Sequence, residues 1–210
     1  MIRIAVLGST RGTNLNTLVA AMKQQHLSAS IELVLSNKAD ALILEKAARF
    51  GIKSMFVNPQ GLSRVDFDHE LSKILRLHQI QLVVLIGYMR ILSAEFVDNW
   101  ENKIINIHPS LLPAYAGLMN LDVHQAVIDG AEVETGCTVH FVTAQVDAGP
   151  IILQKKCSVL PDDTAEILKT RVQELEGPAL VEAINMIAAT DKTQVSHHSH
   201  QATNEIKINQ

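Results

Sequence analysis

Residues 81–86 read Gln-Leu-Val-Val-Leu-Ile, a run in which only the first side chain is polar. A strand that is apolar at nearly every position is typical of a parallel sheet that helices cover on both faces. Residues 63–78 precede this run and carry apolar side chains at helical spacing, with Ser63 as the expected N-cap. A helix that leads into a buried strand is the repeating unit of α/β proteins, so this stretch predicts that fold class.

The residues before this unit repeat the same alternation. Strands and helices are expected in turn at 2–7, 14–25, 31–35, 41–50 and 54–57. Asp40 is the expected N-cap of the second of these helices. This order predicts a doubly wound, mostly parallel, Rossmann-like sheet, whose ligands bind beyond the carboxyl ends of the strands.

The second half of the chain has a different pattern. A strand at 104–108 and a helix at 121–129 are followed by two β-rich runs, 138–142 and 151–159. A turn at 147–150 separates the two runs, which favours an antiparallel, hairpin-like extension of the sheet.

The last apolar pattern predicts a long helix, with Asp162 or Asp163 at its N-cap. This helix should break or kink at Gly177-Pro178, because proline cannot donate a backbone hydrogen bond. Beyond that pattern, the periodicity is lost and Gln, Ser, His, Thr and Asn dominate. The sequence therefore predicts one domain over 1–189 and a disordered polar tail over 190–210.

Composition and charge limit the classes of partner. A net charge of −4 argues against nucleic acid or an anionic membrane, because neither is attracted to an acidic surface. No apolar run reaches the roughly 20 residues of a membrane helix. The chain starts as a strand rather than a signal peptide, and Cys137 and Cys157 lack metal-ligand spacing. A cytoplasmic protein with two reduced thiols is expected.

The strand at 104–108 ends in two polar side chains. Asn106 and His108 interrupt the apolar run at alternate positions, and Pro109 stops it. Alternate residues of a strand point to the same side of a sheet, so the amide and the imidazole lie together. Buried without partners, each would cost about 1–3 kcal/mol. The pair therefore predicts a site where something polar binds.

Residues 8–15 read Gly-Ser-Thr-Arg-Gly-Thr-Asn-Leu and connect the first strand to the first helix. Free N–H groups at the N-terminus of a helix suit a phosphate, which Gly12, Thr13 and Asn14 would hold, with added charge from Arg11. The loop is neither a dinucleotide fingerprint nor a Walker loop. The alternative is a tight turn in which Asn14 only caps the helix.

Two further segments have a functional and a purely structural interpretation. Residues 87–92, Gly-Tyr-Met-Arg-Ile-Leu, follow the most apolar strand and could line a slot for a flat heteroaromatic ligand, or simply pack with Arg90 in solvent. Asp147 lies in a turn where aspartate often bonds the local backbone. If the turn returns to His108, the carboxylate would raise the pKa of that imidazole.

The histidines do not predict a metal site. His108, His124 and His140 have no ligand-like spacing, and His140 alternates with apolar residues as a hydrogen-bonded sheet histidine does. The run at 197–200, His-His-Ser-His, is more typical of a solvated tail.

Taken in order, these segments resemble the glycinamide ribonucleotide formyltransferases, the folate-dependent enzymes of purine synthesis. The similarity extends over residues 1–189 and includes 12–15, 63–64, 87–92, 106–113, 139–143, 147–150 and 171–173. The motif Asn-x-His-Pro-Ser-Leu-Leu-Pro with a downstream Asp-x-Gly-Pro-Ile is specific to the formyltransferase superfamily. The Gly-Thr-Asn loop and the His-Pro-Ser sequence select this family within it.

The resemblance implies a reaction and a role for each matching residue. The formyl group of 10-formyltetrahydrofolate would pass to the amine of glycinamide ribonucleotide, without a metal, in a monomer or homodimer. Asn106, His108 and Asp147 would be catalytic, with His108 held as an imidazolium by Asp147. The implied substrate-binding residues are Gly12, Thr13, Asn14, Gln173 and Glu176. The implied folate-binding residues are Arg64, Met89, Arg90, Ile91, Leu92, Asn106, Thr143, Ala144, Gln145, Val146 and Asp147.

Within the single domain, residues 1–100 would form the phosphate-binding half and residues 101–189 the catalytic and folate-binding half. Two departures from the family stand out. Arg11 lies where many relatives have asparagine, and residues 117–124 replace the familiar Gly-Leu-His-Thr-His with a longer segment in which His124 matches the second histidine. Three alternatives stay open: a formyltetrahydrofolate hydrolase, a transferase that acts on another amine, and a non-catalytic folate- or phosphate-binding domain.

Overall fold

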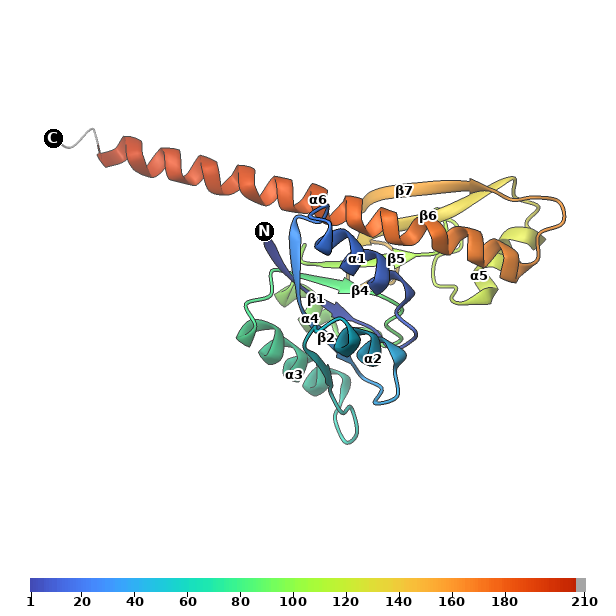
Figure 1. The fold of residues 1–210 in the computed structure, drawn as a ribbon, viewed down its shortest axis with the longest axis horizontal. Coiled ribbons are helices and arrows are strands. Elements are labelled where there is room, and N and C mark those ends of the chain that lie inside the picture. The colour runs from blue at the N-terminus through green and yellow to red at the C-terminus, as the bar shows by residue number, and fades with distance from the viewer. Residues whose placement is uncertain (207–210) are drawn as a thin grey trace.

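The computed structural model describes the backbone of residues 1–206 and the side chains of residues 1–190. A seven-stranded sheet in the order β3-β2-β1-β4-β5-β6-β7 carries helices on both faces (Figure 1). The strands are β1 (Ile2–Leu7), β2 (Ala29–Ser36), β3 (Ser54–Phe56), β4 (Leu82–Leu85), β5 (Ile104–His108), β6 (Glu134–Phe141) and β7 (Ile151–Ser158). The helices are α1 (Thr13–Lys23), α2 (Leu42–Arg49), α3 (Arg64–Leu77), α4 (Ala94–Asn99), α5 (Leu121–Asp129) and α6 (Ala165–Ile206).

The strand directions confirm the predicted fold class. Strands β1 to β5 pair in parallel, whereas β6 pairs antiparallel with both β5 and β7. The sheet is therefore doubly wound and mostly parallel, with an antiparallel extension built from the second half of the chain. One continuous sheet joins the two halves.

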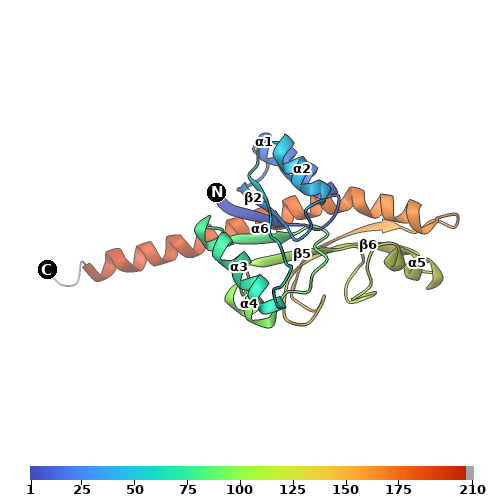
Figure 2. The same ribbon diagram turned by 90° about the horizontal axis from the view of Figure 1, so that it is seen from below.

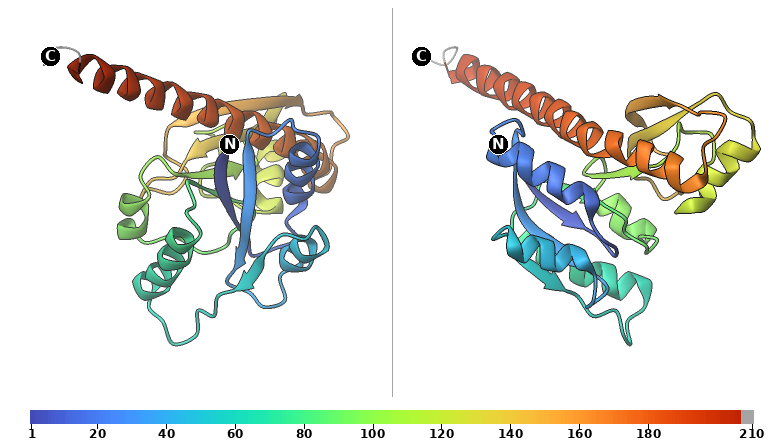
Figure 3. Two further views of the ribbon diagram at one scale, coloured as in Figure 1. Left: turned by 60° about the vertical axis from the view of Figure 1, so that its left-hand side comes forward. Right: turned by 45° about the vertical axis from the view of Figure 1, so that its right-hand side comes forward.

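Alternate residues of β1 face two separate cores. Ile4 and Val6 pack with α1, α2 and α6, whereas Ala5 and Leu7 pack with α3 and α4. Figure 2 shows α1 and α2 on one side of the sheet and α3 and α4 on the other, and Figure 3 shows α6 lying along the sheet beside α1. A strand buried on both faces has to be apolar throughout, as the sequence of β4 already indicated.

The helix starts differ in part from the sequence predictions. Ser63 caps α3 as predicted, because its Oγ accepts a hydrogen bond from Asp66 N at 3.1 Å. The prediction for Asp40 is wrong, since Ala41 occupies the N-cap of α2 and no side chain caps it. The short helix α4, capped by Ser93, was not predicted because six residues are too few to show a periodicity.

The prediction that Asp162 or Asp163 caps the last helix is also wrong. Thr164 Oγ1 accepts a hydrogen bond from Ile167 N at 3.3 Å, in the way that an N-cap side chain does. The carboxylate of Asp163 instead accepts two hydrogen bonds from the guanidinium of Arg171. This ion pair ties the start of α6 to the loop before it.

Helix α6 does not break at Gly177-Pro178, so of the predicted break or kink the break is wrong. Pro178 removes one helical hydrogen bond, but Ala179, Leu180 and Ala183 after it are fully buried and hold the helix against the core. The backbone stays helical to Ile206 and projects beyond the sheet (Figure 1), where the sequence predicted a disordered tail from residue 190. Residues 207–210 of that predicted tail lie outside the described residues.

Within the described residues, no helix is long and apolar enough to cross a membrane. Cys137 and Cys157 are both free thiols, as expected.

Candidate active site

A cavity of about 500 Å³ opens at the carboxyl ends of β1, β4 and β5. The order of the strands reverses between β1 and β4, and ligands of doubly wound sheets bind at such a point. The loops after these two strands are joined directly, because Ser9 N donates to Gly87 O at 3.0 Å and Met89 N donates to Ser9 Oγ at 2.9 Å. The cavity therefore lies where the topology predicts a ligand.

Most residues that the sequence singled out line this cavity. They are Gly12, Thr13, Asn14, Met89, Arg90, Ile91, Leu92, Asn106, His108, Thr143, Ala144, Val146, Asp147, Gln173 and Glu176. Arg64 and Gln145 are exposed and are not part of the lining. The structure thus brings together five segments that lie far apart in the sequence.

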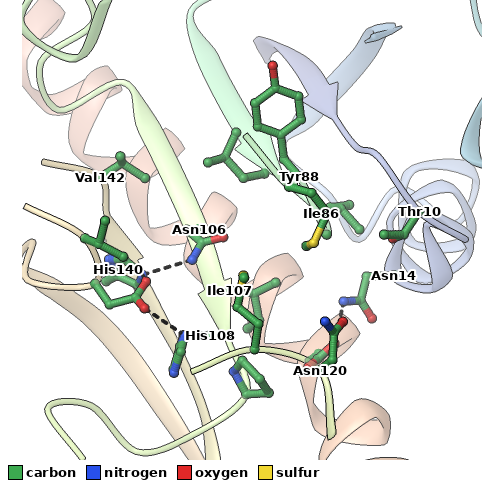
Figure 4. A pocket seen from close by; sticks show the side chains of 18 of the residues that line it. Thr10, Asn14, Ile86, Tyr88, Asn106, Ile107, His108, Asn120, His140 and Val142 are labelled. Atoms are coloured by element: carbon green, nitrogen blue, oxygen red, sulfur yellow. Dashed lines mark hydrogen bonds and ion pairs between the residues drawn. The ribbon is translucent and has the colours of Figure 1, made fainter. Parts of the chain in front are cut away.

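Four polar side chains form a connected cluster on one wall (Figure 4). Asp147 Oδ2 lies 3.2 Å from His108 Nδ1, and Asp147 Oδ1 lies 3.6 Å from His140 Nε2. Asn106 Nδ2 lies 3.2 Å from His140 Nε2. The turn after β6 therefore returns its carboxylate to the end of β5, as the functional interpretation of Asp147 required.

The pKa of His108 is subject to opposing influences. Burial lowers the pKa of His108 from its ordinary 6.5, whereas the Asp147 carboxylate and the Tyr115 carbonyl raise it. Burial has the larger effect, so the ring is mainly uncharged at neutral pH and the expectation of a resting imidazolium is wrong. Both ring nitrogens nevertheless face acceptors, Tyr115 O and Asp147 Oδ2, each at 3.2 Å. A proton that reaches His108 is therefore well stabilised.

His140 is a member of the cluster that the sequence did not reveal. Its Nδ1 donates to Phe141 O at 2.9 Å, which leaves the lone pair of Nε2 facing the amide of Asn106. Burial lowers the pKa of His140, and an uncharged ring is the form that accepts this hydrogen bond. His140 thereby orients Asn106, and the only signal for it was the pairing of β5 with β6, in which Asn106 lies opposite His140.

The backbone around Asp147 is closely constrained. Asp147 has a φ of 53°, and its Oδ2 accepts a hydrogen bond from Gly117 N at 2.9 Å. Gly149 follows in a position without room for a side chain, because an added Cβ would lie 1.8 Å from Phe141 O. The glycine of the Asp-Ala-Gly-Pro turn lets the turn approach β6 and so places the carboxylate.

The Gly149→Ala variant is expected to be less stable by at least about 1–3 kcal/mol, because the methyl group has to displace the backbone of β6. Turnover should fall with it, since the displacement moves Asp147 away from His108. Urea denaturation and steady-state kinetics measure the two effects. The control is Ala148→Ser, at the exposed neighbouring residue, which should change neither the stability nor the turnover. Full activity of Gly149→Ala would contradict this role of the turn.

The glycine-rich loop after β1 leads into α1 without a side-chain cap. Gly12 has a left-handed backbone with a φ of 59°, and an added Cβ would lie 2.3 Å from Ile43. No side chain caps α1, so the interpretation of Asn14 as a helix cap is wrong. Asn14 Nδ2 instead donates to Glu176 Oε2 at 2.7 Å. The free N–H groups at the start of α1 therefore face a cavity and have no competing cap.

Glu176 and Gln173 extend this end of the cavity along α6. Glu176 is only 9% exposed, and burial raises the pKa of its carboxyl group, whereas Asn14 and Lys169 lower it. Gln173 lies three residues earlier, which places it on the same face of the helix. Together they form a polar surface that suits hydroxyl and amide groups.

The opposite end of the cavity is largely apolar. Met89, Ile91 and Val146 have exposed side chains that line the cavity, and Leu92 is buried behind them. The Arg90 guanidinium stacks on the Phe67 ring, 4.4 Å from its centroid, so Arg90 is not simply a solvated charge. This end suits a flat aromatic ligand, which is one of the two interpretations that the sequence of residues 87–92 allowed. Among the described residues, no group of three or more His, Cys, Asp or Glu side chains is arranged to hold a metal ion.

Comparison with known proteins agrees with this geometry. The formyl transferase family model matches residues 2–184. The chain is 41% identical over 177 residues to the phosphoribosylglycinamide formyltransferase of Haemophilus influenzae, across 84% of this chain and 82% of that protein. A solved structure, glycinamide ribonucleotide transformylase 1 from Symbiobacterium toebii, superposes with a TM-score of 0.86 at 40% identity, across 90% of this chain and 89% of that one.

Longer relatives contain a similar segment. The trifunctional purine biosynthetic protein adenosine-3 of Gallus gallus is 43% identical over 189 residues, which are 90% of this chain. The chain spans only 18% of that protein's length.

Proposed function

The chain belongs to the formyl transferase family, and from this premise we propose that it is a phosphoribosylglycinamide formyltransferase of purine synthesis. It transfers the formyl group of 10-formyltetrahydrofolate to the amine of glycinamide ribonucleotide. One observation carries the proposal: a single cavity joins a phosphate-binding loop, the cluster around His108 and Asp147, and an apolar slot. A nucleotide amine and a flat formyl donor can meet there.

The ribonucleotide binds at the polar end. The N–H groups of Gly12, Thr13 and Asn14, together with the hydroxyl of Thr13, hold its phosphate at the positive end of α1. Gln173 and Glu176 contact the ribose and the glycinamide end. The amine is thereby directed toward His108.

The folate binds at the apolar end. Residues 89–92 and 143–147 enclose the pteridine, and Arg64 attracts the carboxylates at the far end of the molecule, beyond the cavity lining. The formyl group then lies beside Asn106 and Asp147. Holding both substrates in one cleft supplies the orientation part of the rate enhancement.

The reaction begins when the free amine attacks the formyl carbon and a carbon–nitrogen bond forms. Negative charge develops on the formyl oxygen. Asn106 Nδ2 carries two hydrogens; one is donated to His140, and the other is free to stabilise this oxyanion. His140 thus keeps the amide turned in the productive direction.

The intermediate collapses when the bond between the formyl carbon and N10 of the folate breaks. His108, uncharged at rest, takes the proton that the attacking amine loses and delivers it to N10. Asp147 stabilises the imidazolium that forms between these two steps. The products are formylglycinamide ribonucleotide and tetrahydrofolate.

A formyltetrahydrofolate hydrolase would use the same cluster with water as the nucleophile. The free N–H groups at the start of α1 and the buried pair of Asn14 and Glu176 favour the transferase, because a hydrolase has no second substrate for them to bind.

The test is to mix the purified protein with 10-formyltetrahydrofolate, with and without glycinamide ribonucleotide, and to follow tetrahydrofolate formation. Rapid turnover is expected only when the ribonucleotide is present. Equal release without it would identify a hydrolase. Folate binding without any turnover would identify a binding domain.

The Thr13→Val variant should raise KM for the ribonucleotide about tenfold or more, because a hydrogen bond to a charged phosphate is worth about 1.5–3 kcal/mol. KM for the folate and kcat should change less than about twofold, since the phosphate is bound at a distance from the reacting carbon. The matched control is Thr170→Val, an exposed site on α6 that does not line the cavity. Similar KM values for Thr13→Val and wild type would mean that the Thr13 hydroxyl does not contact the phosphate.

A further inference from the structure

His124 has a buried ring with an unused hydrogen-bonding atom. The residue lies on α5, is 1% exposed and lines the cavity. Its Nδ1 is buried and has no hydrogen-bond partner among the described residues. Buried polar atoms of side chains are rarely left unpaired, and each exception needs an explanation such as ordered water or a functional role. The ring of His124 also lines the cavity, which places it within reach of a bound substrate.

The ring is also kept uncharged. Burial lowers the pKa of His124 to about 4, and the neighbouring Lys169 and His108 act in the same direction. At neutral pH one ring nitrogen is therefore a donor and the other an acceptor. A ring in this state matches a neutral group with N–H or C=O functions better than it matches a phosphate.

The position of His124 indicates which part of the substrate it faces. Lys169, Gln173 and Glu176 follow one another on the cavity side of α6, with Glu176 next to the phosphate loop through Asn14. His124 is close enough to both Lys169 and His108 for each to affect its charge. The ring thus lies between the polar surface of α6 and the reaction centre.

We propose that His124 is a further substrate-binding residue, whose uncharged ring hydrogen-bonds with the glycinamide part of the ribonucleotide. This inference rests on the proposed function and adds to it a contact next to the attacking amine. The glycinamide part has N–H donors and one carbonyl acceptor, which are the complementary functions. The contact orients the amine between the phosphate, held at Gly12, and the formyl carbon, held near Asn106.

The test uses equilibrium binding to the wild type and to His124→Phe, with glycinamide ribonucleotide and with ribose 5-phosphate, which lacks the glycinamide. The phenyl ring keeps the shape and removes both nitrogens. Affinity for the ribonucleotide should fall about tenfold, as for the loss of one hydrogen bond. Affinity for ribose 5-phosphate should be unchanged, because this ligand lacks the glycinamide that His124 is proposed to contact.

The melting temperature gives an independent readout. His124→Phe should melt at the same or a higher temperature than the wild type, since it removes a polar atom that is buried without a partner. A residue with a purely structural role would instead lower the melting temperature when it is replaced. His124→Asn, which keeps a polar atom near the position of Nδ1, should recover part of the affinity for the ribonucleotide. The exposed His69→Phe is the matched control, and should bind both ligands as the wild type does.

The outcomes separate this inference from the proposed function. If wild type and His124→Phe bind the ribonucleotide equally, His124 does not contact it and the inference is overturned. Equal losses for both ligands would overturn it too, because the effect would not be confined to the glycinamide. If the wild type binds ribose 5-phosphate as tightly as the ribonucleotide, the glycinamide contact does not exist. If the wild type binds neither ligand, the proposed function fails as well.

Discussion

The Asn106→Ala variant is expected to lower kcat about 100- to 1,000-fold, because the loss of one oxyanion donor typically has this effect. Under the proposed function, the Asn106 amide on β5 donates to the formyl oxygen, and His140 holds the amide in place. Single-turnover measurement of tetrahydrofolate formation reports the chemical step directly. KM for either substrate should change much less than kcat, since the donor acts on charge that appears only in the transition state.

Two variants make this test specific. Asn106→Asp keeps the shape of the side chain but replaces the donor nitrogen by an acceptor oxygen, so it should be at least as slow as Asn106→Ala. Gln125→Ala, on the exposed side of α5, should turn over normally. The melting temperature of Asn106→Ala must be recorded too, because His140 loses its hydrogen-bond partner. Near-normal turnover by Asn106→Ala would remove the residue from the mechanism.

Asp147→Asn is expected to lower kcat by about 100-fold or more, the usual contribution of positioned acid–base catalysis. The acid limb of the kcat/KM profile should also move to lower pH. The carboxylate raises the pKa of His108 against the stronger effect of burial, so its removal lowers that pKa further. The uncharged ring then persists to lower pH, and activity is lost there only as the ring becomes protonated.

Steady-state rates between about pH 5 and 9 measure both effects, because kcat/KM reports the groups of the free enzyme. Asp147→Asn keeps the size of the side chain and an oxygen that can accept from Gly117 N. A reduced rate with an unmoved acid limb would mean that Asp147 positions His108 without tuning its pKa.

Local patterns were sufficient to predict much of the site. The alternation of Asn106 and His108 on an apolar strand predicts that both side chains lie on one face of the sheet. The apolar run of β4 predicts the parallel sheet in the same way, since it reports burial on two faces. These features follow from the period of a strand, which a single sequence shows directly.

The contribution of His140 could not be predicted, because it depends on the register between two strands. Asn106 and His140 are opposite partners in β5 and β6, although they are 34 residues apart in the chain. Nothing in either strand alone fixes that register. The protonation state of His108 was predicted wrongly for a related reason. The sequence showed a possible carboxylate partner, but it did not show the burial that outweighs it.

The path of α6 was also beyond local reasoning. Gly177-Pro178 predicts a break or a kink, yet the helix continues, and Leu180 and Ile184 after it are buried in one core with residues of α1 and β6. Gly177 itself allows a close approach to α1, because an added Cβ would lie 2.5 Å from Thr17 Oγ1. A residue that favours a break in an isolated helix thus serves helix packing here.

The packing of α1 against α6 also determines when the nucleotide site is complete during synthesis of the protein. The hydrogen bond from Asn14 to Glu176 joins residues 162 positions apart, so the polar end of the cavity needs the first helix and the last helix together. Strands β1 to β5 can emerge from the ribosome and pair without it. The nascent chain then has an incomplete nucleotide site until α6 has left the exit tunnel, and a product cut short before residue 176 never acquires one.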